Sequence, residues 1–338
     1  VSLSWKRGQK SMLDKFEREI DYLRISLIEK CNLRCTYCMP EGGVMLSPKD
    51  QLMTSQEIIA IAKIFVENGV DKIRLTGGEP LLRKDFSEIA AALAQLPVRL
   101  SITTNAILVD RFIADFKKFG IQDINASLDT LKEEKFRTIT KRDQFHKAFD
   151  NINLLLDQNF NVKLNVVLMK DFNEEEIIDF IALTQDRKLS VRFIEFMPFD
   201  GNLWNKSKLV SQQEILDRAY AHFQKENIEQ LPNEKNFTAR NFRVRGFQGN
   251  FGIISSVTNP FCDSCNRIRL TANGTIKNCL FSNNETNLLQ TFRQGDNIEP
   301  LIKSLLLKKK AVRAGMNTSA KLEDPKNHSN NRSMTTIG

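Results

Sequence analysis

The stretch Cys31-Asn32-Leu33-Arg34-Cys35-Thr36-Tyr37-Cys38 indicates both the fold and the chemistry of this chain. Each thiolate is able to ligate iron, and three thiolates leave one iron of a four-iron cluster without a protein ligand. An open metal position is typical of a catalytic centre, whereas structural sites are closed. The stretch follows a predicted strand at 22–28, so we expect it to form the loop after the first strand of the fold.

The six cysteines fall into two groups of three and none is left over: Cys31, Cys35 and Cys38, then Cys262, Cys265 and Cys279. A structural zinc ion is an alternative for either group, but zinc takes four ligands. A fourth ligand would have to come from one of only three histidines in the chain, and none lies near a cysteine group in the sequence. Disulfides are a weaker interpretation, because clustered cysteines in an intracellular protein more often bind metal.

Length and composition describe a soluble globular protein of one large domain or two ordinary ones. The chain has 338 residues, 41% hydrophobic and 27% charged, and no apolar stretch approaches the roughly 20 residues that cross a bilayer. The net charge of +8 suits nucleic acid, an anionic small substrate or no particular partner. We expect the run Lys308-Lys309-Lys310 to be a solvated helix face.

Predicted strands alternate with amphipathic helices between residues 22 and 197, which indicates an α/β fold with parallel strands and helical crossovers. Six such units form either an incomplete (βα)6 TIM-type barrel or a doubly wound sheet. The strands are expected at 22–28, 72–75, 98–103, 123–127, 162–169 and 191–196, with helices at 55–68, 110–119 and 174–185. We divide the chain into an N-terminal extension (1–21), a partial barrel (22–230) and a smaller α+β domain (231–338) with an extended tail. Lys6, Arg7 and Lys10 are compatible with the remnant of a basic targeting peptide.

Polar residues gather where the predicted strands end, which is where parallel barrels carry their catalytic groups. The loop at 76–80 contains Gly77 and Gly78, which allow the backbone to approach a ligand closely. Lys163 and Asn165 share one face of the fifth strand, so we expect both to point into the barrel toward a ligand. Arg192 and Met197 have opposite parity on the sixth strand, so only a loop at Pro198 would bring Met197 inward.

A hairpin is predicted in the C-terminal part. Asn273-Gly274 favours a two-residue type I′ turn, which pairs Ala272 with Thr275 and places Cys279 opposite Ile268. Cys279 would then return to Cys262 and Cys265. Arg267 and Arg269 lie beside this group on one face, and a pair of guanidinium groups suits a phosphate-bearing ligand.

These motifs together resemble a known family. The CxxxCxxC spacing is similar to the signature of the radical S-adenosylmethionine (SAM) enzymes. The chain as a whole resembles the GTP 3′,8-cyclases, the molybdenum cofactor biosynthesis protein A family, and is closer to the animal form than to the bacterial one. The resemblance rests on CNLRCTYCMPEGG, KIRLTGGEPLLR, TTN, INASLD, VKLNVVLMK, VRFIEFMPFDGN and FCDSCNRIRLTANG with Cys279.

The resemblance implies a site for each group of residues. It implies one [4Fe–4S] cluster on Cys31, Cys35 and Cys38 and a second on Cys262, Cys265 and Cys279. SAM would lie near Tyr37, Gly78, Ser127 and Met197. GTP would contact Arg24, Arg74, Thr103, Lys163, Arg267, Ile268 and Arg269, with Arg192, Arg267 and Arg269 as positioning groups.

The implied reaction is that of a lyase acting through a radical. The deoxyadenosyl radical removes the 3′ hydrogen of GTP, and C3′ attacks C8 to give (8S)-3′,8-cyclo-7,8-dihydroguanosine 5′-triphosphate. This is the first step of molybdenum cofactor (molybdopterin) biosynthesis, and the product passes to cyclic pyranopterin monophosphate synthase. The resemblance also implies a homodimer in the mitochondrial matrix, with the cytoplasm as the alternative location. It predicts no membrane span and no nucleic-acid partner, and it leaves the electron donor open.

Two positions depart from the family pattern. The family's TTNG reads Thr103-Thr104-Asn105-Ala106 here, and alanine does not freely take a positive φ, so we expect a slightly different turn. The family tail ends in Gly-Gly and reaches the active site, whereas this sequence ends Thr336-Ile337-Gly338. Two rival functions remain: a radical SAM enzyme with an auxiliary cluster that acts on a peptide, and a basic zinc-binding nucleic-acid module.

Overall fold

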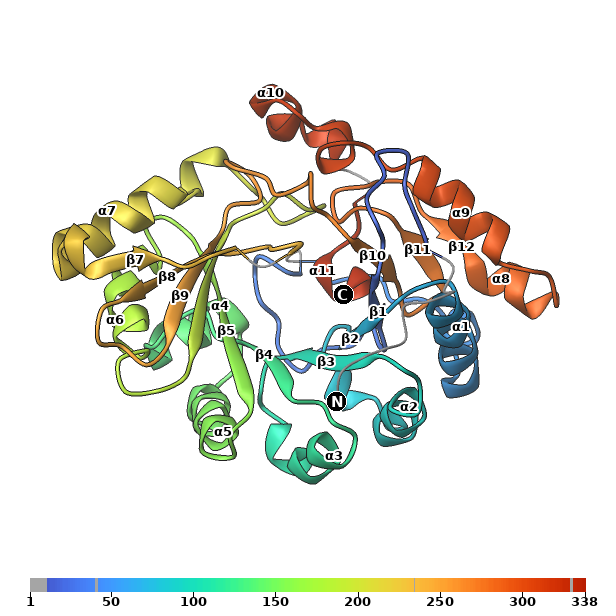
Figure 1. The fold of residues 1–338 in the computed structure, drawn as a ribbon, viewed down its shortest axis with the longest axis horizontal. Helices are drawn as coiled ribbons and strands as arrows, with labels where there is room; N and C mark the ends of the chain where they lie inside the picture. Colours follow the sequence, from blue (N-terminus) through green and yellow to red (C-terminus); the bar gives the residue numbers. More distant parts are fainter. Residues whose placement is uncertain (1–10, 40–41, 234, 329–330) are drawn as a thin grey trace.

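The computed structural model describes residues 11–39, 42–233, 235–328 and 331–338. The basic residues Lys6, Arg7 and Lys10 lie outside these ranges. One twelve-stranded sheet organises the molecule, in the order β12-β11-β10-β1-β2-β3-β4-β5-β6-β9-β8-β7 (Figure 1). The strands are β1 Tyr22–Ser26, β2 Lys72–Thr76, β3 Arg99–Thr104, β4 Asp123–Ser127, β5 Asn161–Leu168, β6 Ser190–Glu195, β7 Ile228–Gln230, β8 Arg240–Val244, β9 Asn250–Ile254, β10 Arg267–Leu270, β11 Thr275–Lys277 and β12 Thr286–Asn287.

The α-helices lie mainly on the convex side of this curved sheet (Figure 1). They are α1 Ser55–Glu67, α2 Phe86–Leu93, α3 Ile113–Lys118, α4 Glu133–Thr140, α5 Phe145–Asp157, α6 Ile177–Ala182, α7 Gln212–Phe223, α8 Leu288–Arg293, α9 Glu299–Leu307, α10 Ser319–Glu323 and α11 Met334–Ile337. α1 begins at a capping box, in which Thr54 and Glu57 each bond the backbone N–H of the other.

The alternation of strands and helices is confirmed as an α/β fold. β1 to β6 are all parallel to their neighbours, and each of the six predicted strands lies within two residues of its expected bounds. Right-handed crossovers between parallel strands place the helices on the outer face of the sheet. The carboxyl ends of all six strands therefore meet at one rim.

Strands from the C-terminal part extend the barrel sheet at both edges. β10 pairs in parallel with β1, and β9 pairs in parallel with β6. The hairpin strands β11 and β8 then continue the sheet in antiparallel fashion. Residues on either side of our boundary at 230 therefore share one sheet, and the domain division stays a prediction.

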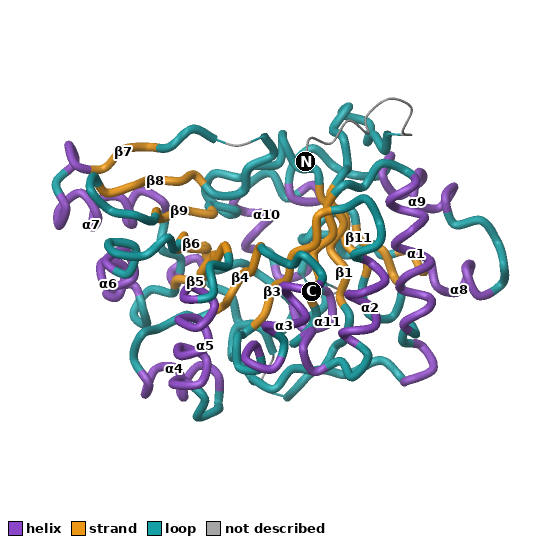
Figure 2. Tube along the Cα trace, turned by 60° about the horizontal axis from the view of Figure 1, so that its bottom comes forward, coloured by secondary structure: helices purple, strands orange, loops and turns teal. Residues whose placement is uncertain are grey.

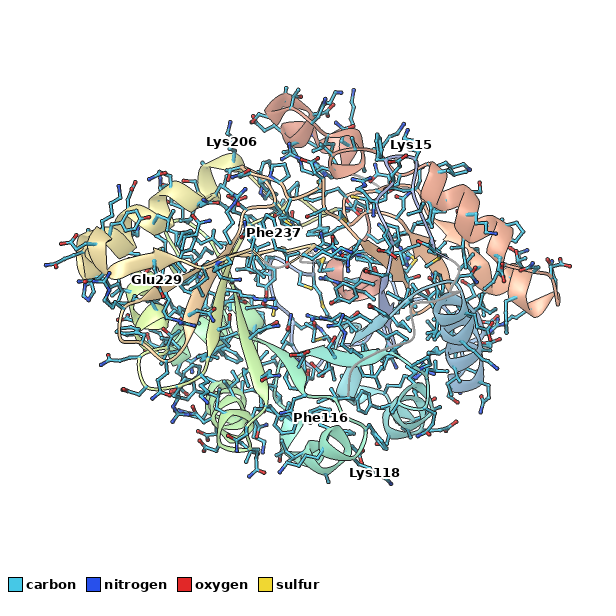
Figure 3. The ribbon with its side chains drawn as sticks, in the orientation of Figure 1. Lys15, Phe116, Lys118, Lys206, Glu229 and Phe237 are labelled. Atoms are coloured by element: carbon cyan, nitrogen blue, oxygen red, sulfur yellow. The ribbon has the colours of Figure 1, made fainter. Side chains whose placement is uncertain are left out.

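Side chains alternate between an apolar outer face and a polar inner face of the sheet. Leu23, Ile25, Ile73 and Leu75 are fully buried on the outer face against the helices. On α3, Phe116 is buried against the sheet while Lys118 is exposed (Figure 3). Because the barrel interior is polar, the apolar core lies between sheet and helices, and the interior is available for a polar ligand.

The C-terminal residues are not extended, contrary to our expectation. α10 and α11 are short helices, and α11 lies inside the opening of the barrel (Figures 1 and 2). Thr335, Thr336 and Ile337 are buried there, and Ser333 donates a hydrogen bond to the Cys38 carbonyl at 2.5 Å. Burial of apolar and hydroxyl groups stabilises this segment as a plug. None of the helices described is long and apolar enough to cross a bilayer.

Candidate active site

A cavity of about 730 Å³ occupies the barrel interior and contains both cysteine groups. Every residue that we assigned to a cluster, to SAM or to GTP lines it except Ile268. Ile268 is fully buried in the apolar core on the other face of β10. Alternation points the Ile268 side chain away from the cavity, so the predicted contact of Ile268 with GTP would have to come from its backbone.

The first cysteine group lies in the loop after β1. The backbone turns tightly at Cys35, whose carbonyl accepts the N–H groups of Cys38 and Met39 at 3.0 and 2.9 Å. The Cys31 sulfur accepts the Leu33 N–H at 3.4 Å and lies 3.8 Å from Asn105 Nδ2. None of these cysteines forms a disulfide.

Electrostatics of the first group favour a bound cationic metal centre. Burial raises the pKa of the Cys31 thiol to about 11 and that of Cys38 to about 12, and neighbouring cysteines add to the effect for Cys38 and Cys35. Three such thiolates would repel one another without a positive core between them. Metal ligands must be deprotonated, so a metal centre would reverse these pKa shifts.

Tyr37 is held by an acid that the sequence analysis left without a role. The Tyr37 hydroxyl donates to Asp129 Oδ2 at 2.8 Å, and Asp129 Oδ1 accepts the Val167 N–H at 2.8 Å. Burial raises the pKa of Asp129 to about 6. Asp129 therefore ties the cysteine loop to the ends of β4 and β5. In the sequence it was detectable only as the last residue of the motif INASLD, where the fourth predicted strand ends.

The glycines of the loop after β2 line the cavity, and they also pack closely against the backbone of the cysteine loop. A Cβ on Gly78 would lie 2.3 Å from the Lys30 carbonyl oxygen, and one on Gly77 would lie 2.5 Å from that of Ile28. Gly78 N–H bonds the Ile28 carbonyl at 2.7 Å, and Glu79 N–H bonds that of Lys30 at 2.9 Å. The two glycines thus allow the cysteine loop and the glycine loop to pair.

Glu79 connects the glycine loop to the end of β3. Its carboxylate accepts the Thr104 hydroxyl and the Asn105 N–H, both at 2.8 Å, and it is completely buried. Burial raises the pKa of Glu79 to about 7 despite these bonds. The next turn contains Ala106 at φ 66°, so the departure from TTNG is accommodated in the left-handed region at a cost of about 1–2 kcal/mol.

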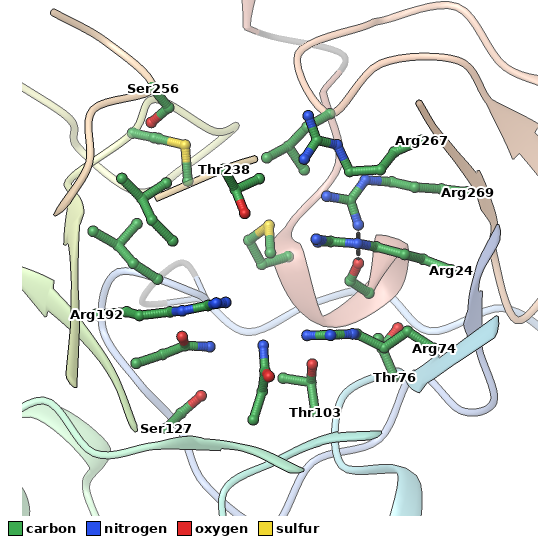
Figure 4. Close-up of a pocket in the computed structure, with 18 of the residues that line it drawn as sticks. Arg24, Arg74, Thr76, Thr103, Ser127, Arg192, Thr238, Ser256, Arg267 and Arg269 are labelled. Atoms are coloured by element: carbon green, nitrogen blue, oxygen red, sulfur yellow. Dashed lines mark hydrogen bonds between the residues drawn. The ribbon is translucent and has the colours of Figure 1, made fainter. Parts of the chain in front are cut away.

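Cationic side chains form rows across three neighbouring strands on the inner face. In register, Arg24 of β1 lies between Arg269 of β10 and Arg74 of β2. Two residues earlier on each strand, and therefore on the same face, Tyr22 lies between Arg267 and Lys72. Figure 4 shows the guanidinium groups of Arg24, Arg74, Arg267 and Arg269, which extend into the cavity from one wall. Arg192 extends from the opposite wall.

These cations are buried beside one another. Burial and the neighbouring Arg24 and Arg267 lower the pKa of Arg269 to about 9. The Nε atoms of Arg24 and Arg74 are buried without a hydrogen-bond partner among the described residues. Arg269 donates to the carbonyl of the C-terminal residue Gly338, so one of these cations already has an acceptor within the chain. Buried like charges are costly, and an anion in the cavity would offset that cost.

The opposite wall carries the polar residues of β5 and β6. Lys163 and Asn165 both line the cavity, as their shared face predicts; their contact with a ligand stays a prediction. Burial, followed by the charge of Arg192, lowers the pKa of Lys163 to about 8. Met197 also lines the cavity, because β6 ends at Glu195 and the following loop redirects the chain. Asn202 fixes that loop by donating to the Met197 carbonyl at 2.8 Å.

The second cysteine group forms as predicted in outline, but the hairpin register is wrong by one residue. Thr271, and not Ala272, pairs with Thr275, and the Gly274 N–H bonds the Thr271 carbonyl at 2.9 Å. Gly274 alone has a positive φ of 69°, whereas Asn273 does not. The loop is therefore one of three residues with glycine in the left-handed position. The strands still lead Cys279 back to Cys262 and Cys265.

Charges around the second group differ from those around the first. Burial would raise the pKa of the Cys265 thiol, but the positive charges of Arg267 and Lys309 outweigh it and lower that pKa to about 6. Burial raises the pKa of Cys279 and of Cys262. Lys309 is buried, so the run 308–310 is not a uniformly solvated helix face. α9 ends at Leu307, before the run begins.

Comparison with known proteins identifies the family. Residues 25–184 match the radical SAM superfamily, and residues 189–314 match the molybdenum cofactor synthesis C family. The chain is 45% identical to "GTP 3′,8-cyclase, mitochondrial" of Arabidopsis thaliana, over 92% of this chain and 80% of that protein. It is 41% identical to GTP 3′,8-cyclase of Listeria welshimeri, over 81% and 84%. The chain belongs to the GTP 3′,8-cyclase family of radical SAM proteins.

Other relatives include the human molybdenum cofactor biosynthesis protein 1, which is 46% identical over 90% of this chain and 49% of that protein. The chain thus spans about half the length of the animal relatives it matches. Among solved structures, SuiB of Streptococcus suis bound to S-adenosylmethionine matches with a TM-score of 0.58 and 16% identity, over 91% of this chain and 73% of that chain. At this identity the likeness concerns the fold alone.

Membership of the radical SAM superfamily implies a [4Fe–4S] cluster and SAM, and the first cysteine group fits that cluster. Among the described residues, no three His, Cys, Asp or Glu side chains converge closely enough to hold a single metal ion. A four-iron cluster needs no such convergence, because each thiolate binds a different iron.

Proposed function

We propose that this protein is a GTP 3′,8-cyclase that converts GTP to (8S)-3′,8-cyclo-7,8-dihydroguanosine 5′-triphosphate, the first step of molybdenum cofactor biosynthesis. The observation that carries the proposal is the pair of cationic rows on β10, β1 and β2, in the one cavity that both cysteine groups line. A triphosphate supplies the several negative charges that these rows require. Membership of the family supports the same substrate.

The first cluster would be held by Cys31, Cys35 and Cys38, with Tyr37, Gly78, Ser127 and Met197 around SAM. When bound, SAM supplies the radical that begins the reaction. The second cluster would be held by Cys262, Cys265 and Cys279 on the opposite side of the substrate. Their three thiols, like those of the first group, leave a four-iron cluster with one open iron for a ligand atom of guanine.

The protein's contribution would be positioning. The triphosphate would be bound by the four arginines of one wall, Arg24, Arg74, Arg267 and Arg269. Lys163 and Arg192 would approach GTP from the opposite wall, and Thr103 would contact it between the two walls. Two fixed walls hold the ribose in one orientation, and near-attack placement is a large source of rate acceleration. α11 covers part of the opening and would help to exclude water from the reacting groups.

We infer further that the protein works as a homodimer in the mitochondrial matrix, and that its product passes to cyclic pyranopterin monophosphate synthase. The similarity to the mitochondrial enzyme of Arabidopsis thaliana supports the location.

The test is anaerobic incubation of the reconstituted chain with SAM, dithionite and GTP, followed by mass analysis of the nucleotide. The proposal predicts 5′-deoxyadenosine and a GTP isomer of unchanged mass that is absent without SAM. Arg24→Met and Arg74→Met should weaken GTP binding, whereas exposed Lys118→Met is the matched control. Deoxyadenosine formation with no new nucleotide, or an equal response to a peptide, would favour the peptide-acting alternative.

A further inference from the structure

Lys309 is a buried lysine beside the second cysteine group. Its side chain is only 2% exposed, whereas the flanking Lys308 and Lys310 are exposed. It follows the last turn of α9, where its N–H bonds the Leu306 carbonyl at 3.0 Å. The chain thus directs one lysine of three inward, at the point where the helix has ended.

The partners of this ammonium group lie in the cysteine loop. Lys309 Nζ donates to the Arg267 carbonyl at 2.9 Å and lies 3.5 Å from the Cys265 sulfur. Within the described residues, no carboxylate forms an ion pair with Lys309. A buried ammonium without a counter-charge is strongly disfavoured. The anion that it faces must therefore be the Cys265 thiolate and whatever that thiolate ligates.

A second buried cation holds the backbone around Lys309 independently. Arg18 donates to the Cys262 carbonyl at 2.7 Å and to those of Lys310 and Ala311, both at 3.0 Å. Asp14 fixes the guanidinium at 2.6 Å. One side chain thus ties the cysteine loop to the segment after α9. Loss of the Lys309 charge should leave this backbone connection in place.

We propose that Lys309 is a positioning residue for the second cluster, where its ammonium group contacts the Cys265 sulfur and favours the more negative, reduced state of that cluster. The inference rests on the proposed function in one respect, the presence of a cluster on Cys262, Cys265 and Cys279. Thiolate-ligated clusters are anionic, and hydrogen bonds to their sulfurs and nearby charge set their potentials. At a contact of 3.5 Å in a buried site, such a charge acts with little screening.

The same contact links the cluster to the substrate. Lys309 binds the carbonyl of Arg267, which begins β10 and whose side chain belongs to the cationic rows. One ammonium group thus fixes a cluster ligand and the backbone of a triphosphate-binding arginine. Its removal should perturb the second cluster without changing the first.

The experiment compares Lys309→Met with Lys308→Met and Lys310→Met in the full chain after anaerobic reconstitution. Iron release to a chelator and the EPR-monitored midpoint potential of the second cluster are measured. Lys309→Met should release about four of about eight irons at least roughly tenfold faster than wild type. Its second-cluster potential should be more negative, and both control variants should match the wild-type chain.

Lys309→Gln provides a second variant, because its amide is still able to donate to the Arg267 carbonyl but carries no charge. It should shift the potential in the same direction even if Lys309→Met folds poorly. Wild-type iron release and potential in both Lys309 variants would overturn this inference alone. A wild-type chain that retains only about four irons would overturn the second cluster itself, while GTP cyclisation is scored separately.

Discussion

Replacing Gly78 with alanine should displace the first cysteine group and leave the second in place. The added Cβ would lie 2.3 Å from the Lys30 carbonyl oxygen, 2.5 Å from the Lys30 carbonyl carbon and 2.8 Å from the Glu29 carbonyl oxygen. All three are backbone atoms, so no side-chain rotation relieves the overlap. The cysteine loop must move away, and Cys31 directly follows Lys30.

The cost follows from the contacts that this movement breaks. The Gly78–Ile28 and Glu79–Lys30 backbone bonds would be lost, at about 1 kcal/mol each. Residual overlap adds about 1–3 kcal/mol. The total of about 3–5 kcal/mol is a large part of the roughly 5–15 kcal/mol by which domains are stable.

Thermal unfolding of the iron-free chain and iron counting after reconstitution test this reasoning. Gly78→Ala should lower the Tm and reduce the iron content from about eight to about four per chain. Gly42→Ala is the control, because a Cβ at Gly42 meets no atom within 4 Å. A Gly78→Ala chain with the Tm and iron content of Gly42→Ala would refute the steric argument.

Three further outcomes are expected. Burial raises the pKa of the Tyr22 phenol, but Arg74, Arg24 and their neighbours lower it to about 7, so above pH 7 the free protein carries a phenolate that opposes triphosphate. Deprotonation of Tyr22 should therefore lower the GTP affinity measured by calorimetry by at most roughly fiftyfold from pH 7 to 9. Tyr22→Phe should lose this component and keep only the decline above pH 8 as Lys163, and then Arg269, lose their charges. Exposed Glu17 has φ 60°, so Glu17→Gly should raise the free energy of unfolding by about 0.5–1 kcal/mol in urea titrations. Thr104→Val removes a hydroxyl bonded to Glu79 at 2.8 Å and should lower that free energy by about 2 kcal/mol; an unchanged midpoint would contradict the assigned bond.

The alternation of predicted strands and helices along the chain was sufficient to predict the six barrel strands, and the alternation of side chains along β5 was sufficient to predict its inward face. Lys163 and Asn165 are two residues apart, and this local pattern fixes their common direction. The cationic rows were only partly predictable, because they depend on register between strands distant in sequence. Tyr22 and Lys72 precede Arg24 and Arg74 by two residues, so the same alternation would have placed them in the cavity.

The errors have local physical causes. The predicted hairpin register was wrong by one residue because the loop contains three residues instead of two. The Thr271 side chain accepts the Thr275 N–H at 3.1 Å and stabilises this longer loop. The pairing of the glycine loop at 77–78 with the cysteine loop was not predicted, because a sequence does not reveal which backbone segment approaches a glycine. Lys309 was taken as solvated because its burial depends on where α9 ends relative to Cys265.

The pairing of β10 with β1 explains how cationic residues that are distant in the sequence form one row. Arg24 and Arg74 form two of the three positions of a row, and β10 completes it by placing Arg269 in register with Arg24. The same strand begins two residues after Cys265, so its register also fixes the second cysteine group relative to the cations. Side chains on a strand alternate, and therefore a slip of one residue at this pairing would turn both arginines of β10 into the apolar core. The cationic rows and the placement of the second cysteine group therefore depend on one strand pairing, and neither would survive its loss.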